Sequence, residues 1–199
     1  MIPRHLLIGV AVMIVLAMGA GFYVWRMRGH VQSNQVVVAG TQPVAPPPSG
    51  PTEQVTLYVA DDDAGILHAQ TAHIPLPAGR QERAEELSRA LLDVYMDKSS
   101  PHVLGPGSEV RNVYLVDPGL AVIDLNAAFA DGHRSGILVE QLTTASLLGT
   151  LCGNIPGITR VKILVDGKER ETLAGHVDLS GFFEVAQVNQ MMTELGIPR

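Results

Sequence analysis

The sequence predicts an α+β fold in which a mixed, mostly antiparallel sheet has two main helices packed on one face, preceded by one transmembrane helix. Two segments repeat apolar residues every three or four positions, as helices do. Several β-rich runs are separated by short turn sequences, which is typical of hairpins. A long uncharged run begins at residue 6. Hairpins interleaved with helices favour a sheet covered by helices on one face.

The N-terminal segment is long and apolar enough to span a bilayer. Leu6–Trp25 contains no charged residue, and as a helix it is about 30 Å long, the thickness of a membrane's hydrocarbon core. Small residues at 17–20 leave a cleaved signal peptide as the alternative. Because the apolar part of a signal peptide is only about 7–15 residues long, we expect residues 1–28 to be an uncleaved N-terminal anchor.

Residues 29–54 have the composition of a linker. They contain Pro46–Pro48 and several glycines but almost no charge. Such a segment is a flexible coil that stiffens where prolines gather, and it spans about 30 Å on average. We therefore expect the folded domain, residues 55–183, to stand clear of the membrane.

The first part of the domain predicts two extended segments and a helix. Residues 55–59 alternate as a strand does, and Asp61–Asp63 end the alternation. Residues 66–76 look extended again and end in prolines. Residues 80–97 place apolar side chains on one helical face, with acidic residues in the first half, where the helix dipole favours them.

A β-hairpin and a second helix follow. The β-rich runs 110–116 and 120–125 are joined by Asp117-Pro118-Gly119, in which proline presets φ and glycine accepts the positive φ of a tight turn. Residues 137–152 then carry an apolar stripe at helical spacing. They predict a helix with one buried face.

The C-terminal part predicts a second hairpin and a helical tail. Residues 160–165 alternate as a strand does, and Asp166-Gly167 is a strong hairpin signal that leads into 169–173. Residues 184–199 form the tail, in which apolar residues recur at helical spacing.

The charge and cysteine content exclude several classes of function. Three of the 14 basic residues are arginines beside the apolar span, so the rest of the chain has 11 basic and 20 acidic residues, a net charge of −9. A domain this acidic does not attract nucleic acid. Cys152 is the only cysteine, so no disulfide can form within the chain. It lies on the apolar stripe of the second predicted helix, which favours a buried thiol over a reactive one.

The motifs of the folded part resemble those of the GerM-type sporulation and spore germination domain, written GerMN. The similarity extends over about residues 55–183, and its most specific part is the ending LAGHVDLS, Leu173–Ser180. The other segments that carry it are the hairpin Val113–Asn126, Glu140 and Leu142 in the second helix, Ile158–Val161, and Leu164–Gly167.

The resemblance implies a non-catalytic module on the extracytoplasmic side of a bacterial cytoplasmic membrane, held there by a single pass. Its expected partner is another envelope protein or a second copy of the chain, bound through the hairpin 110–125 or the helix 137–152. The candidate interaction or motif residues are Asp117, Gly119, Asp124, Glu140, Asp166, Gly167, Gly175, His176 and Asp178.

The polar clusters give little indication of a metal or cofactor. Asp61–Asp63 lack the alternating ligands and closing glutamate of a calcium loop, which favours a solvated turn. The seven histidines lack the spacing that places two zinc ligands on one helix face. No nucleotide-binding or serine hydrolase motif occurs, and Ser135 has no base nearby in the sequence. We therefore expect no bound metal or cofactor.

Three polar residues, His176, Asp178 and Glu140, are candidates for either a functional or a structural role. His176 and Asp178 share a face if they lie in a strand, where they could form an acid/base couple or a hydrogen bond that fixes the strand end; the structural role is favoured. Glu140 is expected to be exposed in the first turn of its helix, where the dipole favours an acid.

The alternative to an interaction module is a glycan-binding domain or a weak cell-wall hydrolase. Its candidate residues would be Asp124, Glu140, His176 and Asp178. Only 5% of the chain is aromatic, and its one tryptophan, Trp25, lies in the predicted membrane segment. Because sugar-binding faces usually display aromatic rings, this composition favours the interaction module.

Overall fold

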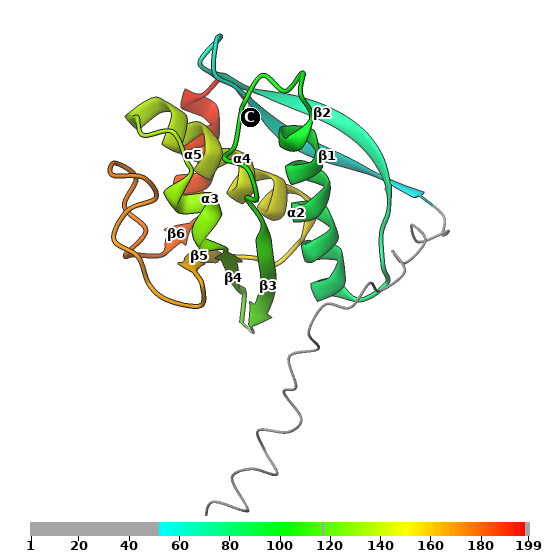
Figure 1. Cartoon of the computed structure of the whole chain (residues 1–199). Helices are drawn as coiled ribbons and strands as arrows, with labels where there is room; N and C mark the ends of the chain where they lie inside the picture. Colours follow the sequence, from blue (N-terminus) through cyan, green and yellow to red (C-terminus); the bar gives the residue numbers. More distant parts are fainter. Residues whose placement is uncertain (1–51, 117, 198–199) are drawn as a thin grey trace, which may run out of the picture. The chain divides into compact units, whose positions relative to one another are not determined.

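The computed structural model describes residues 52–116 and 118–197, which form an α+β fold (Figure 1). Up to β5 the strands and main helices follow the order that the sequence indicated, with the short helix α3 as an addition. The elements are β1 Thr52–Asp61, β2 Ile66–Pro75, α2 Arg80–Met96, β3 Val110–Val116, β4 Leu120–Leu125, α3 Ala127–Asp131, α4 Ile137–Asn154, β5 Arg160–Val165, β6 Phe183–Glu184 and α5 Val185–Glu194.

The strands form two sheets, whereas the sequence led us to expect one. β1 and β2 pair as an antiparallel hairpin, and the other four strands lie in the order β3-β4-β5-β6. The four-stranded sheet is mixed, because β4 and β5 are parallel while the other neighbours are antiparallel. A parallel pair needs a long crossover connection, and α3 and α4 provide it here.

α4 is the centre of the core. Eleven of its 18 residues are buried, on nearly all sides of the helix, and it contacts β1, α2 and α5. In Figure 1 it runs through the middle of the molecule, between α2 and α5. The expectation that α4 buries only one stripe was therefore wrong. Most of residues 137–152 are buried and cannot serve as a contact surface.

A row of polar side chains on α4 replaces a neighbouring strand for β1. Asn154 Oδ1 accepts the Thr56 N–H at 3.1 Å, and its Nδ2 donates to the Thr56 carbonyl at 2.7 Å. Thr150 Oγ1 accepts the Tyr58 N–H, and Ser146 Oγ donates to the Tyr58 carbonyl. Residues four apart share a helix face, so this row satisfies the free edge of β1 and joins the hairpin to the core.

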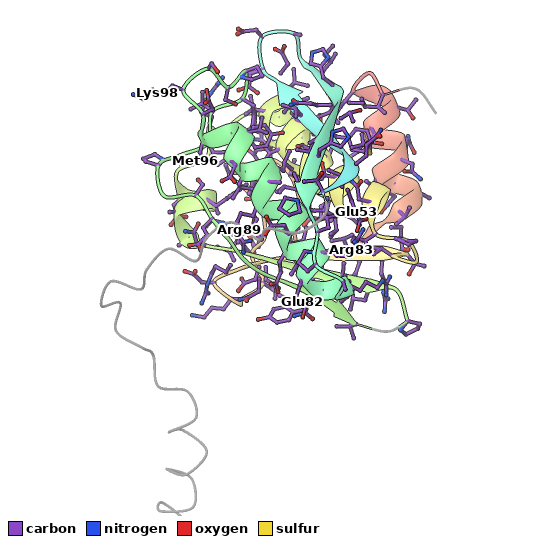
Figure 2. The ribbon with its side chains drawn as sticks, turned by 90° about the vertical axis from the view of Figure 1, so that its right-hand side faces the viewer. Glu53, Glu82, Arg83, Arg89, Met96 and Lys98 are labelled. Atoms are coloured by element: carbon purple, nitrogen blue, oxygen red, sulfur yellow. The ribbon has the colours of Figure 1, made fainter. Side chains whose placement is uncertain are left out.

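α2 also holds β1. Arg83 donates from both terminal nitrogens to the two carboxylate oxygens of Glu53, at 2.8 and 2.7 Å. Figure 2 shows the two side chains next to each other. Further along, the buried Tyr95 hydroxyl accepts the Ala60 N–H at 2.9 Å and contacts Ser146 Oγ.

Most of the predicted elements agree with the structure. The two helices begin at the expected residues and differ by one or two residues at their ends. The hairpin 110–125 is confirmed, and the tail contains α5. The short helix α3, whose N-cap Asn126 accepts the Phe129 N–H, and the two-residue strand β6 were not predicted.

The second predicted hairpin was wrong beyond its turn. Asp166 and Gly167 both have positive φ, 49° and 71°, as the tight turn requires. Only Lys168 then pairs back, with Val165, and residues 169–173 form no strand. The chain instead leaves the sheet after Lys168 and returns only at β6, which pairs with Arg160 and Val161 at the other end of β5.

The expected N-terminal anchor, residues 1–28, lies outside the described residues. Within residues 52–116 and 118–197, no helix combines the length and hydropathy of a membrane span. Thr52–Gln54, which we assigned to the linker, belong to β1.

Removal of the Tyr95 hydroxyl tests how β1 is held to α2 and α4. Tyr95→Phe leaves the buried Ala60 N–H without its acceptor, and the expected loss is about 1–3 kcal/mol in the free energy of unfolding. Tyr114→Phe is the matched control, because the Tyr114 side chain is 43% exposed. Urea unfolding of the full chain in detergent, followed by circular dichroism, gives both values. Equal losses in the two variants would contradict the structural role of the hydroxyl.

Candidate functional site

Glu140 is a fully buried carboxylate that binds a distant loop. Its Oε2 accepts the backbone N–H groups of Ala174, His176 and Val177 at 3.1, 3.0 and 2.9 Å. Its Oε1 accepts the Gly136 N–H at 3.2 Å and lies 2.8 Å from His176 Nδ1. The expectation of an exposed helix-terminal acid was wrong, because these donors replace the water that the charge would otherwise need.

The hydrogen bonds keep Glu140 ionised. Burial by itself raises the pKa of the carboxyl, but the N–H groups of Val177, His176 and Ala174, together with the His176 side chain, lower it to about 2. A carboxyl that remains charged at every physiological pH is suited to holding a loop. It is unsuited to donating a proton.

His176 and Asp178 do not form a couple. The His176 ring turns to Glu140, while Asp178 Oδ1 accepts the N–H and the hydroxyl of Ser180 at 2.7 and 2.6 Å. These two bonds lower the pKa of Asp178. Gly175 precedes His176 with a φ of 117°, a conformation that favours glycine. The residues of the motif LAGHVDLS thus make hydrogen bonds that hold this loop in place.

Ser135 lies beside the His176 ring but is not arranged as a nucleophile. Its Oγ is 3.4 Å from His176 Nδ1, the same nitrogen that faces Glu140 at 2.8 Å. A Ser-His-acid relay needs the hydroxyl and the carboxylate on opposite ring nitrogens. Because both groups face the same ring nitrogen, His176 cannot relay a proton from Ser135 to Glu140.

A second arrangement has the connectivity of a triad but is buried. Asp62 Oδ1 lies 2.6 Å from His102 Nδ1, and His102 Nε2 lies 2.9 Å from Thr143 Oγ1. His102 and Thr143 are both 0% exposed, so no substrate can reach the hydroxyl. The expected solvated turn at Asp61–Asp63 was wrong for Asp62, whose side chain is 8% exposed.

The predicted residues of the two turns have structural roles. Buried Asp124 accepts the Gly167 N–H at 2.7 Å, and Arg111 lies 3.6 Å from Asp124 and 3.3 Å from Asp166. The carbonyl of Gly119, whose φ is 80°, accepts the Thr159 N–H at 2.7 Å. Asp117 lies outside the described residues.

One side of the four-stranded sheet carries a surface that sequence reasoning missed. Tyr114 and Val116 on β3 are 43% and 48% exposed, and Phe182 is 48% exposed. Strand pairing places Val122 and Lys162 beside Tyr114 in one row, and Leu120 and Arg160 beside Val116 in a second row. We call the surface made by these rows the outer sheet face, and its residues are Tyr114, Val116, Leu120, Val122, Arg160, Lys162 and Phe182.

Two basic side chains of β5, Arg160 and Lys162, contact the Phe182 ring and so connect it to the strands. The Arg160 guanidinium carbon lies 4.8 Å from the centre of the Phe182 ring, and Lys162 Nζ lies 5.7 Å from it. Lys162 Nζ also donates to the carbonyls of Leu179 and Ser180 at 3.2 and 2.6 Å. The loop after β5 is thereby fixed across the sheet. The alternation of β3 could have suggested this face, but the position of Phe182 could not be inferred.

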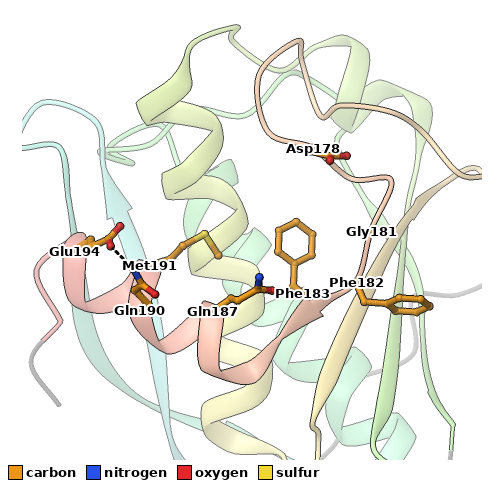
Figure 3. Close-up of a pocket in the computed structure, with 8 residues that line it drawn as sticks. All are labelled: Asp178, Gly181, Phe182, Phe183, Gln187, Gln190, Met191 and Glu194. Carbon is orange, nitrogen blue, oxygen red and sulfur yellow. Dashed lines mark hydrogen bonds between the residues drawn. The ribbon is translucent and has the colours of Figure 1, made fainter.

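An open hollow of about 360 Å³ lies next to this face, between the loop and α5. Figure 3 shows the Phe183 ring pointing into it, while the Phe182 ring points to the other side of the chain. The hollow combines aromatic residues with carboxylates and amides; its lining includes Asp178, Phe182, Phe183, Gln187, Gln190 and Glu194.

The described residues give no metal site. Among residues 52–116 and 118–197, no three histidine, cysteine or acidic side chains lie close enough to share an ion. Burial raises the pKa of the Cys152 thiol to about 11. The thiol is therefore uncharged at neutral pH, as its apolar position indicated.

A family model described as Germane, sporulation and spore germination, matches residues 56–171, which is more than half of the chain. The chain is similar in structure to the tandem GerMN domains of the sporulation protein GerM from Bacillus subtilis, with a TM-score of 0.51 and 23% identity over 67% of this chain and 46% of that one. The chain thus spans less than half of that structure.

The first GerMN domain of the same protein, taken alone, matches with a TM-score of 0.49 and 23% identity, over 67% of this chain and 98% of that domain. No curated protein matches the chain.

Glu140→Gln tests the buried anchor. Gln keeps the shape but removes the charge and points an amide toward the backbone N–H groups. The difference between the ordinary pKa of 4.5 and about 2 corresponds to on the order of 3 kcal/mol of folding free energy. Because the folded-state pKa is lowered, this stabilisation is complete above about pH 4.5 and is lost as the pH falls toward 2.

We therefore expect the wild type to exceed Glu140→Gln in unfolding free energy by about 3 kcal/mol at pH 7, with a smaller difference toward pH 2. Glu82→Gln is the control, because Glu82 lies in the first turn of α2 and is exposed. It should change stability by only about 0.3–1 kcal/mol. A difference that is independent of pH would show that charge is not the cause.

Proposed function

Because the chain belongs to the Germane (sporulation and spore germination) family, we propose that it is a non-catalytic interaction module of the bacterial cell envelope. Its folded domain binds another envelope protein or a second copy of the chain. The observation that carries this proposal is the outer sheet face.

The outer sheet face has the composition of a contact surface. Tyr114, Val116 and Phe182 are large apolar side chains left exposed on one side of the sheet. Aromatic and arginine residues supply most of the binding energy in protein interfaces, and Arg160 lies over Phe182 here. Strand pairing fixes the backbone beneath these side chains, so their positions are set before a partner arrives.

The charge of this face favours an acidic partner. Arg160 is exposed within a chain whose net charge is −6, so the face is a local exception to an acidic surface. Opposite charges across an interface orient the partners and speed their encounter. A second copy of this acidic chain meets that condition, and so does an acidic envelope protein.

The placement of the domain in the cell is part of the proposal. Leu6–Trp25 would hold the chain in the cytoplasmic membrane as a single pass, with residues 29–51 as the tether and the domain on the extracytoplasmic side. The support is the length and composition of these segments.

The state of the acidic residues favours binding over hydrolysis. A glycosidase needs one carboxyl whose pKa is raised so that it can donate a proton. The pKa values of Glu140 and Asp178 are both lowered by hydrogen bonds. Neither residue is suited to the role of general acid that a hydrolase needs.

Site-specific crosslinking in native membranes tests the contact surface. A photo-reactive amino acid at Val116 of the full chain should give a defined crosslinked product. The same group at Gln70, an exposed residue of β2, should give none. The double substitution Tyr114→Ser with Phe182→Ser should lower the yield from Val116 about tenfold. Equal products from both positions, or a yield unaffected by the double substitution, would contradict the proposal.

The hollow beside α5 supports a second candidate function, binding of cell-wall glycan. A sugar ring stacks on an aromatic side chain while its hydroxyls bond to amides and carboxylates, and Phe183, Gln187 and Gln190 supply both kinds of group. This adds an aromatic residue that the sequence analysis did not assign to a binding face.

Calorimetry with soluble peptidoglycan fragments decides on this second function. If glycan binds in the hollow, Phe183→Ala abolishes saturable binding, while Tyr114→Ala, an exposed residue outside the lining of the hollow, preserves it. Circular dichroism spectra of the two variants must agree for the comparison to hold. An absence of saturable binding by the wild type would eliminate the glycan function and leave the protein interaction module.

A further inference from the structure

Four buried or half-buried groups form a continuous polar chain at one end of α4. It runs from Asp62 through His102 and Thr143 to His133. Thr143 Oγ1 lies 2.9 Å from His102 Nε2 and 2.6 Å from His133 Nε2. The last contact of this polar network joins His133 Nδ1 to the Arg134 carbonyl, at 2.7 Å. His102 and Thr143 are 0% exposed, and His133 is 8% exposed.

The number of protons that these four side chains need can be counted from their contacts. A carbonyl cannot donate, so His133 must carry a proton on Nδ1. The carboxylate of Asp62 likewise requires a proton between itself and His102 Nδ1. If both rings are neutral, each Nε2 is then a bare acceptor, and the single Thr143 proton can satisfy only one of them. The other Nε2 faces a hydroxyl lone pair.

One additional proton removes this conflict. With His102 doubly protonated, its Nδ1 donates to Asp62 and its Nε2 donates to Thr143, whose hydroxyl then donates to His133. All four contacts are then satisfied, because His102 donates to Asp62 on one side, and on the other side the donors point from His102 through Thr143 and His133 to the Arg134 carbonyl. The Val139 carbonyl, which also lies 2.9 Å from Thr143 Oγ1, already accepts an N–H within the helix and does not require the hydroxyl proton.

We propose that the Asp62–His102–Thr143–His133 chain is a proton-binding site that holds one proton in addition to those of two neutral histidines. This proton ties the loop after β1 and the loop after α2 to α4. Its release loosens these loops, so the end of the domain that contains them responds to pH in the range where histidines titrate.

The surrounding charges are consistent with this position of the proton. Asp62 Oδ2 accepts from exposed Arg134 at 2.9 Å, and the Tyr95 ring lies edge-on to His102 at 4.7 Å. Burial lowers the pKa of His133, although the Arg134 carbonyl and the carboxylates of Glu140 and Asp62 act in the opposite direction. The proposal accordingly takes His133 as the neutral ring and places the additional proton on His102, whose Nδ1 lies 2.6 Å from Asp62 Oδ1.

The direction of the pH response follows from which state binds the proton. Under this proposal the folded domain binds one proton more than the unfolded polypeptide does, so the stabilisation is complete at low pH and is lost as the pH rises. When the proton leaves, the hydroxyl of Thr143 can satisfy only one of the two rings. The contact between His102 and α4 or that between His133 and α4 is then broken.

NMR of the histidine ring nitrogens tests the proposal on the full chain in detergent micelles. With ¹⁵N-labelled histidine, His102 should show both ring nitrogens protonated at pH 6, and His133 should show a proton on Nδ1 only. Exposed His73 provides the reference for an ordinary ring. The variants His102→Gln and His133→Gln assign the signals. If both network rings are neutral at every pH from 5 to 8, the proposal is wrong.

Two neighbouring threonines supply a matched pair of variants. Thr143→Val removes the hydroxyl that joins the rings, so His102 should lose its proton at a lower pH, and the Asp62 N–H, bonded to the Pro101 carbonyl, should exchange faster. Thr144→Val should change neither, because Thr144 Oγ1 is buried without a hydrogen-bond partner among the described residues. An unchanged His102 titration in Thr143→Val would also overturn the proposal. If Thr143→Val does not fold, the wild-type spectra decide.

Discussion

The buried carboxylate of Glu140 is the interaction on which the arrangement of the C-terminal half depends. An ionised group can be removed from water only if hydrogen bonds replace its hydration. Here the backbone N–H groups of Ala174, His176 and Val177 in one loop, the Gly136 N–H and the His176 ring do so. The long connection from β5 to β6 has almost no regular structure of its own, and this carboxylate fixes it to the central helix.

The position of that loop determines the surface that the protein presents. Once residues 174–177 are held, Leu179 can donate to Glu171 and offer its carbonyl to Lys162. Phe182 then lies over Arg160 and extends the outer sheet face beyond the strands. The same connection forms one wall of the hollow into which Phe183 points. A charge inside the molecule thus organises both surfaces that carry proposed functions.

Local pattern predicted the parts of the fold that local forces determine. The apolar spacing of residues 80–97 and the proline and glycine of the turn at 117–119 are sufficient for a helix and a hairpin. Asn154 and Thr56 are 98 residues apart, and Glu140 meets its donors 34 to 37 residues away, so neither role appears in any window of the sequence. Glu140 was misread because an acid in a first helical turn usually needs only the dipole and water. The spacing of Ser146, Thr150 and Asn154 was visible, but its meaning depended on β1.

Amide hydrogen exchange at Ala174, His176 and Val177 in the full chain tests the central role of Glu140 most directly. At pH 7 these three N–H groups should exchange as slowly as those of strand β4, although they lie in a loop. Glu140→Gln should accelerate the three selectively, while β4 remains protected. Fast exchange of these amides in the wild type, or slow exchange that persists in Glu140→Gln, would contradict the account.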